Sequence, residues 1–193
     1  DFNGDTHPDV ISSSDRTGVG NPITLRLLTN DGTRTLTLVP TFSIPFAGHL
    51  DALDFDRDGD QDLVIVTTTG DLALLRNGGT ANFAAPVIIL AGPIAGFPTF
   101  GDFNGDNRTD AAIPLGTSGY AVVLADATGG FLPAVVHAVP GGAHGVASAD
   151  LNEDGDLDLL IVEGDVDEPA LQTSVALGDG AGGFGAGVEG VSG

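Results

Sequence analysis

Four short segments rich in Asp and Asn recur at nearly regular spacing along the 193-residue chain. They read DFNGDTHPD, DFDRDGDQD, DFNGDNRTD and DLNEDGDLD, and they begin at residues 1, 54, 102 and 150. The starts are therefore 53, 48 and 48 residues apart. A period of this length indicates a chain built from repeated supersecondary units that pack on their neighbours.

Each acidic segment is followed by apolar runs that favour β-strands. The runs directly after the four segments are VISSS, LVIV, AAIPL and LLIV, and a second apolar run, a Gly-rich turn and further short runs follow. These runs are short, apolar and bounded by Gly, Asn and Asp, whereas a helical repeat would need a 3.6-residue period. Four short strands in a unit of roughly 40–50 residues are typical of a propeller blade. We therefore predict an all-β fold, a β-propeller-like array of about four four-stranded blades.

The repeats define a single repeat domain over residues 1–193, with units of about 1–53, 54–101, 102–149 and 150–193. Two arrangements of its ends stay open. Either the two ends complete one blade between them, or the chain is an excerpt of a larger propeller. The last unit stops about where the next loop-bearing strand is due, so we favour the excerpt.

The charge balance restricts the classes of partner. The chain has six Arg and no Lys against 27 Asp and Glu, a formal net charge of −21. A surface this acidic repels the phosphate backbones of nucleic acids, which argues against nucleic-acid binding. It also repels anionic membranes. The apolar runs are too short to span a bilayer, and the lack of Cys excludes disulfides.

The acidic segments are candidate calcium loops. In the second segment an Asp stands at every other position from Asp54 to Asp62. Without a cation these carboxylates repel one another, whereas Ca²⁺ takes six to eight oxygen ligands. Alternate side chains, at positions 1, 3, 5 and 9, can point to a common centre, and position 7 is expected to add its main-chain carbonyl. An all-oxygen set disfavours zinc and copper, and magnesium prefers a smaller octahedral site.

Two other interpretations of these segments compete with a calcium loop of this kind. A solvated acidic turn is one, since Asp and Asn favour turns, but four aligned copies argue against it. An EF-hand is the other, and it requires a Glu at position 12 and flanking helices. Position 12 is Ser12, Ile65, Ile113 and Ile161, each within an apolar run. The EF-hand interpretation therefore fails.

Position 6 of the loop calls for a left-handed turn. Gly59 and Gly155 suit it, Asn107 tolerates it and Thr6 does not suit it. We therefore rank the loops that begin at Asp54 and Asp150 as the strongest sites. The loop that begins at Asp1 ranks weakest, also because its first ligand is the first residue.

The pattern D-x-[DN]-x-D-x-x-x-D before an apolar strand resembles the FG-GAP/VCBS repeat family, which occurs in integrin α-subunit propellers and in bacterial extracellular proteins. The resemblance implies a propeller in which each loop joins two strands of a blade. Family propellers have about seven units, and the full Phe-Gly-Gly-Ala-Pro signature is missing here. The resemblance implies about four Ca²⁺ per chain, with these side-chain ligands: Asp1, Asn3, Asp5 and Asp9; Asp54, Asp56, Asp58 and Asp62; Asp102, Asn104, Asp106 and Asp110; Asp150, Asn152, Asp154 and Asp158. The main-chain ligands would be His7, Asp60, Arg108 and Asp156.

We expect a secreted or cell-surface calcium-binding module that serves adhesion, protein–protein interaction or assembly, with a protein or glycan partner, further repeats or self-association. The alternative is a carbohydrate-binding module or the propeller part of a polysaccharide-active enzyme. Of the 23 Asp, 15 lie in the four loops, and no other carboxylates form an evident catalytic pair. We therefore do not expect the chain to be an enzyme.

Overall fold

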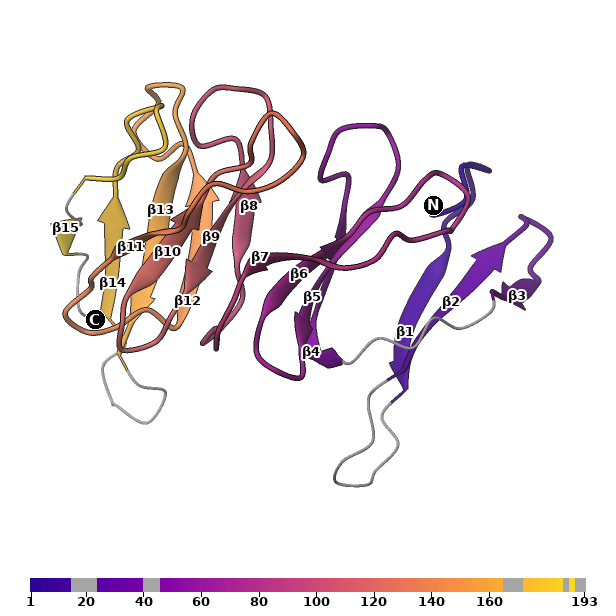
Figure 1. The fold of residues 1–193 in the computed structure, drawn as a ribbon. Helices are drawn as coiled ribbons and strands as arrows, with labels where there is room; N and C mark the ends of the chain where they lie inside the picture. Colours follow the sequence, from indigo (N-terminus) through magenta and orange to yellow (C-terminus); the bar gives the residue numbers. More distant parts are fainter. Residues whose placement is uncertain (15–23, 40–45, 165–171, 186–187, 190–193) are drawn as a thin grey trace. The chain divides into compact units, whose positions relative to one another are not determined.

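The computed structural model of the protein describes residues 1–14, 24–39, 46–164, 172–185 and 188–189. All regular secondary structure in these residues is β-strand (Figure 1). The prediction of an all-β fold is therefore confirmed. The described residues include no helix of the length and hydropathy needed to cross a membrane.

The chain divides into two compact units, the first from Asp1 to Gly92. One sheet of this unit has the order β1 (Val10–Ser14), β2 (Thr24–Asn30) and β3 (Leu36–Leu38). The other has the order β4 (Phe46–Leu53), β5 (Asp62–Thr67), β6 (Leu72–Leu75) and β7 (Val87–Leu90). Within each sheet, each strand pairs antiparallel with the next strand along the chain.

The second unit runs from Pro93 to Gly193 and contains two four-stranded sheets. The first is β8 (Thr99–Gly101), β9 (Asp110–Pro114), β10 (Tyr120–Val123) and β11 (Val135–His137). The second is β12 (Gly145–Ala149), β13 (Asp158–Glu163), β14 (Gln172–Ala176) and β15 (Val188–Glu189). The strand order again follows the chain, and all pairs are antiparallel.

Four separate sheets of three or four strands agree with the predicted blades. The sheets are offset from the sequence repeat by one strand, because each four-stranded sheet begins with the strand that precedes its acidic loop. The loop therefore connects the first two strands of the sheet in three of the four cases. The loop at residues 1–9 precedes β1, which begins a sheet of three strands in the described residues.

Apolar side chains between neighbouring sheets form the core of each unit. The middle strands β5, β6, β9 and β10 are buried on both faces, while the outer strands β3, β7 and β11 are largely exposed. In the first unit the core joins Leu25 and Leu27 of β2 with Ile65 of β5 and Leu75 of β6. Burial on both faces explains why these strands are continuous apolar runs rather than alternating patterns.

An aromatic residue at the second loop position anchors the loop in the core. Phe2, Phe55 and Phe103 are at most 5% exposed. The Phe103 ring lies 5.5 Å from Phe184, which follows the Gly-rich turn of the neighbouring sheet, and Phe2 is 5.9 Å from Phe83 in the same way. Three of the four acidic loops are thus fixed at one side to the hydrophobic core, whereas Leu151 at this position of the fourth loop is exposed.

Candidate metal-binding loops

The carboxylate at position 9 fastens each loop to the hairpin turn beyond it. One oxygen of Asp62 accepts the Phe55 N–H at 3.0 Å, and the other accepts the Asn77 N–H at 2.7 Å. The equivalent pairs of donors are Phe2 and Asn30 for Asp9, Phe103 and Ala125 for Asp110, and Leu151 and Gly178 for Asp158. The same two bonds therefore hold all four loops.

Three of the four position 9 carboxylates are buried, and Asp9 is partly buried. Asp62, Asp110 and Asp158 are fully inaccessible to solvent. Burial raises the pKa of Asp62 and of Asp110, although the two backbone N–H donors oppose that shift. Nearby positive charge would favour their ionised form.

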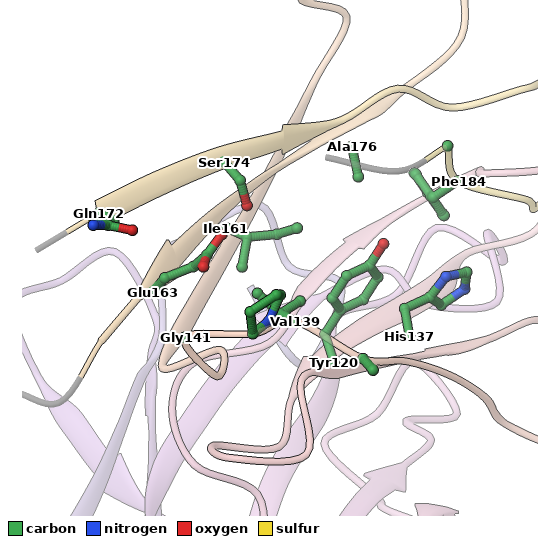
Figure 2. Close-up of a pocket in the computed structure, with 13 residues that line it drawn as sticks. Tyr120, His137, Val139, Gly141, Ile161, Glu163, Gln172, Ser174, Ala176 and Phe184 are labelled. Atoms are coloured by element: carbon green, nitrogen blue, oxygen red, sulfur yellow. The ribbon is translucent and has the colours of Figure 1, made fainter. Parts of the chain in front are cut away.

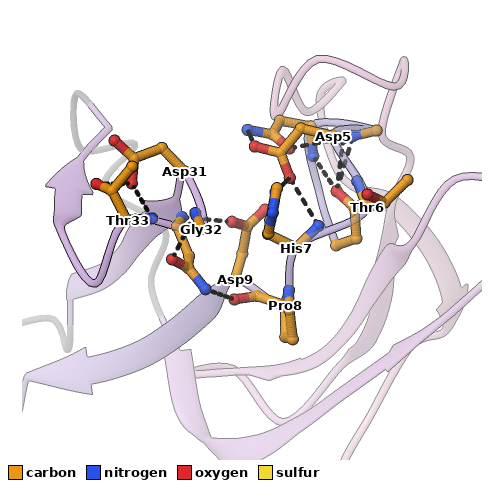
Figure 3. Close-up of polar contacts among 12 residues, drawn as sticks. Asp5, Thr6, His7, Pro8, Asp9, Asp31, Gly32 and Thr33 are labelled. Atoms are coloured by element: carbon orange, nitrogen blue, oxygen red, sulfur yellow. Dashed lines mark hydrogen bonds and ion pairs between the residues drawn. The ribbon is translucent and has the colours of Figure 1, made fainter.

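The carboxylate at position 1 organises the tip of the loop. Asp102 accepts the Asp106 N–H at 3.1 Å and the Asn107 N–H at 2.7 Å, which are the amides of positions 5 and 6. Asp150 receives the equivalent pair from Asp154 and Gly155. In the first loop the Asp5 and Thr6 amides donate to Asp1 (Figure 3). The turn therefore wraps around the first carboxylate.

The loop at residues 54–62 has the donor set that a hard cation requires. Carboxylate oxygens of Asp54, Asp56 and Asp58 all lie within 4.8 Å of one another. Asp54 Oδ1 is buried and has no hydrogen-bond partner. A buried carboxylate oxygen without a partner is costly, and a cation in contact with it would remove that cost. The residues of this loop therefore fit Ca²⁺.

The other three loops have Asn in place of Asp at position 3. Asn104 Nδ2 donates to Asp106 Oδ2 at 2.9 Å, and Asn104 Oδ1 accepts the Asp106 N–H at 3.1 Å. The equivalent side-chain bonds join Asn3 to Asp5 and Asn152 to Asp154. These loops bring positions 1, 3 and 5 together as predicted, with two carboxylates and one amide oxygen available to a cation.

The position 7 side chains of three loops lie over a glycine of the neighbouring turn, whereas Arg108 bonds Asp106. A Cβ at Gly79 would lie 2.5 Å from Asp60 Oδ2, and one at Gly180 would lie 2.5 Å from Asp156 Oδ1. His7 occupies the same place over Gly32 and contacts Asp5 at 3.3 Å (Figure 3). A contribution of position 7 to a metal would therefore come from the main chain.

Arginine side chains pair with two of the candidate ligands. Arg76 Nε lies 3.1 Å from Asp56 Oδ2, and Arg108 bonds both the Asp106 carboxylate and the Ala125 carbonyl. A cation in either loop would compete with a guanidinium for the same carboxylate. Sequence spacing alone did not reveal the Arg76 contact, because Arg76 is at the end of a different strand.

The backbone is left-handed at two positions of each loop, and the sequence predicted one of them, position 6. Position 6 has φ values of 72°, 97°, 61° and 96° at Thr6, Gly59, Asn107 and Gly155. Position 4 is also left-handed, at Gly4, Arg57, Gly105 and Glu153. Each loop thus has glycine at one of the two positions and a strained side-chain residue at the other. The ranking of loops by position 6 alone therefore did not consider position 4, where the backbone is also left-handed.

The family model described as FG-GAP-like repeat matches residues 1–65 and 54–113. The chain belongs to this family, as its repeat pattern predicted. No curated protein matches the chain significantly.

One similar solved structure is that of a lectin from Agrocybe aegerita. It is described as the structural basis of this lectin's specific recognition of non-reducing terminal N-acetylglucosamine. The identity is 19% and the TM-score 0.59, over 95% of this chain and 52% of the other. The present chain therefore spans about half the length of that chain. The similarity supports the β-propeller-like fold.

The position 9 carboxylate and the position 5 carboxylate have different roles, which mutation separates. Asp110→Ala leaves two buried backbone donors unpaired and should cost about 2–4 kcal/mol of unfolding free energy, with calcium or with chelator. Asp106→Ala should cost clearly more with calcium than with chelator, because without a metal it loses only part-buried hydrogen bonds with Asn104 and Arg108. Denaturant unfolding under both conditions measures the difference. Equal losses with chelator would contradict these roles.

The strain at position 4 gives a second prediction. Glu153→Gly, measured with chelator, should raise the unfolding free energy by about 0.5–1 kcal/mol because glycine adopts this φ without a Cβ clash. Glu153→Ala is the matched control, since it removes the charge and keeps the Cβ. An equal gain in both variants would show that charge rather than backbone strain is responsible.

Proposed function

We propose that the chain is an extracellular calcium-binding β-propeller repeat module that serves adhesion, protein–protein interaction or assembly. The observation that carries the proposal is the convergence of Asp54, Asp56 and Asp58 within 4.8 Å, with a buried and unpartnered oxygen on Asp54. Family membership and the same backbone arrangement in all four loops support its extension to the other three.

Calcium would stabilise the loops by replacing repulsion with shared coordination. Four divalent ions would offset eight of the 21 net negative charges. Each ion that binds only the folded state adds about 2.7 kcal/mol at 100 times its Kd. Calcium outside cells is millimolar, which suits sites of low affinity, and this supports a secreted or surface location. The acidic surface argues for a protein or glycan partner rather than a nucleic acid.

The ion pairs of the loops suggest an order of filling. The loop at residues 150–158 has glycine at position 6, and its described carboxylates have no arginine partner. The loop at residues 102–110 must displace Arg108 from Asp106. We expect the former to bind calcium more tightly than the latter.

Isothermal titration of the chelated protein with calcium should show about four sites. Asp58→Ala and Asp154→Ala should each remove one site, and Arg108→Ala should increase the affinity of one site because the competing cation is gone. Titration with magnesium is the control for general charge neutralisation. A count of zero or one calcium ion would contradict the proposal.

A carbohydrate-binding module is the second candidate function. Its support is the structural similarity to a lectin, together with a cavity lined by Tyr120, His137 and Phe184 in the second unit. Neither function requires catalysis, and we propose that the chain has none. An immobilised panel of glycans, with and without calcium, separates the candidates. Binding of one glycan class that survives mutation of the loops would favour the lectin-like function, and no binding would favour the protein-directed one.

A further inference from the structure

A cavity of about 390 Å³ lies between the two sheets of the second unit (Figure 2). Its walls come from Tyr120 of β10, His137 of β11, Ile161 and Glu163 of β13, and Ser174 of β14. This volume falls in the range of small-molecule sites. The calcium loops are not among the lining residues.

Several side chains that line the cavity differ from those at the equivalent places in the first unit. Strand register defines the equivalence: Leu75 pairs with Leu63, the first residue after Asp62, and Ala176 pairs with Leu159, the first after Asp158. Leu75 is fully buried in the first core, and the smaller Ala176 at the equivalent place lines the cavity.

The same register shows that the new space is polar. Ser174 stands where the first unit has Ala73, and Glu163 stands where it has Thr67. On the facing sheet, Tyr120 occupies the place of Leu25. At these three places the first unit has two apolar residues and Thr67, whereas the second has a hydroxyl, a carboxylate and a phenol.

Glu163 is the charged residue of this cavity, and it is 9% exposed. Within the described part of the chain, its carboxylate has no hydrogen bond or ion pair. The carboxylate can therefore receive a cation or several donors from a molecule in the cavity. Figure 2 shows the Glu163 and Ser174 side chains extending from neighbouring strands into one space.

The opposite wall is aromatic and apolar. The Tyr120 and His137 rings stack at 4.8 Å, and Phe184 meets His137 edge to face at 6.3 Å. His137 Nε2 is buried without a partner, and burial lowers the pKa of this imidazole, so it adds no positive charge at neutral pH. Val139 and Ile161 complete the apolar surface.

We propose that this cavity binds a small organic ammonium ion with an apolar body. The ammonium group has three donors, which suit the Glu163 carboxylate and the Ser174 hydroxyl. The apolar body contacts Ile161, Val139 and the aromatic wall, where the ring faces also attract a cation. The net charge of −21 raises the local concentration of such ligands. This site does not depend on the calcium proposal.

The test uses 2-phenylethylamine, which is protonated at neutral pH, and its uncharged analogue 2-phenylethanol. Titration is followed by NMR in the calcium-containing protein at moderate salt. The amine should bind at least about tenfold more tightly than the alcohol, and the shifts should map to Tyr120, Ile161 and Ser174. Glucose serves as a neutral polyol probe. If glucose or the alcohol binds as tightly as the amine, the cavity is not an ammonium site.

Glu163→Gln keeps the shape of the side chain and should weaken amine binding by about tenfold while leaving the alcohol unaffected. Asp51→Asn is the control, because it removes one carboxylate from β4 of the first unit, outside the cavity. If Glu163→Gln does not fold, two other measurements test the proposal. One is amine binding to Ser174→Ala, and the other is the comparison of amine with alcohol on the unmodified chain. Amine binding that Glu163→Gln and Asp51→Asn weaken equally would reflect general charge attraction and would overturn the proposal.

Discussion

The hydrogen-bonded carboxylate at the ninth loop position, buried in three of the four loops, is the interaction on which the rest of the structure depends. In each repeat its two oxygens accept one amide from the start of the loop and one from the turn after the next hairpin. The loop, the hairpin turn and the first two strands of the sheet are therefore joined at one point. Because that point lies beside the apolar space between neighbouring sheets, loop geometry and core packing are fixed together.

This arrangement explains why an acidic loop occurs in every repeat. In three of the four repeats the core side of the loop is held by Phe2, Phe55 or Phe103, and in all four the turn side is held by the ninth carboxylate. Between them, positions 1, 3 and 5 are constrained to approach one another although two or three of them are carboxylates. The scaffold thus imposes electrostatic repulsion that a bound cation would relieve, which connects the stability of the fold to the proposed function.

Much of the fold and of the candidate site was predictable from the sequence. The other features could not be predicted, for physical reasons. The period, the strand type and the acidic loops follow from local patterns such as Asp54 to Asp62 followed by LVIV. The left-handed position 4 was missed because Arg57 and Glu153 carry no local signal for that conformation. The Arg76–Asp56 pair and the cavity beside Glu163 depend on register and on contacts between sheets, which a single sequence does not specify. The predicted ligands themselves remain predictions until a metal is measured.

The most direct test of the account is the thermal unfolding of the unmodified chain with calcium and with excess chelator at moderate salt. If the loops bind calcium in the folded state alone, chelation should lower the melting temperature by roughly ten degrees or more, since even two well-filled sites rival the net stability of a domain. Calcium returned in excess should restore the original transition, and magnesium should restore less of it. A melting temperature that does not change on chelation would contradict the account and leave the loops as solvated acidic turns.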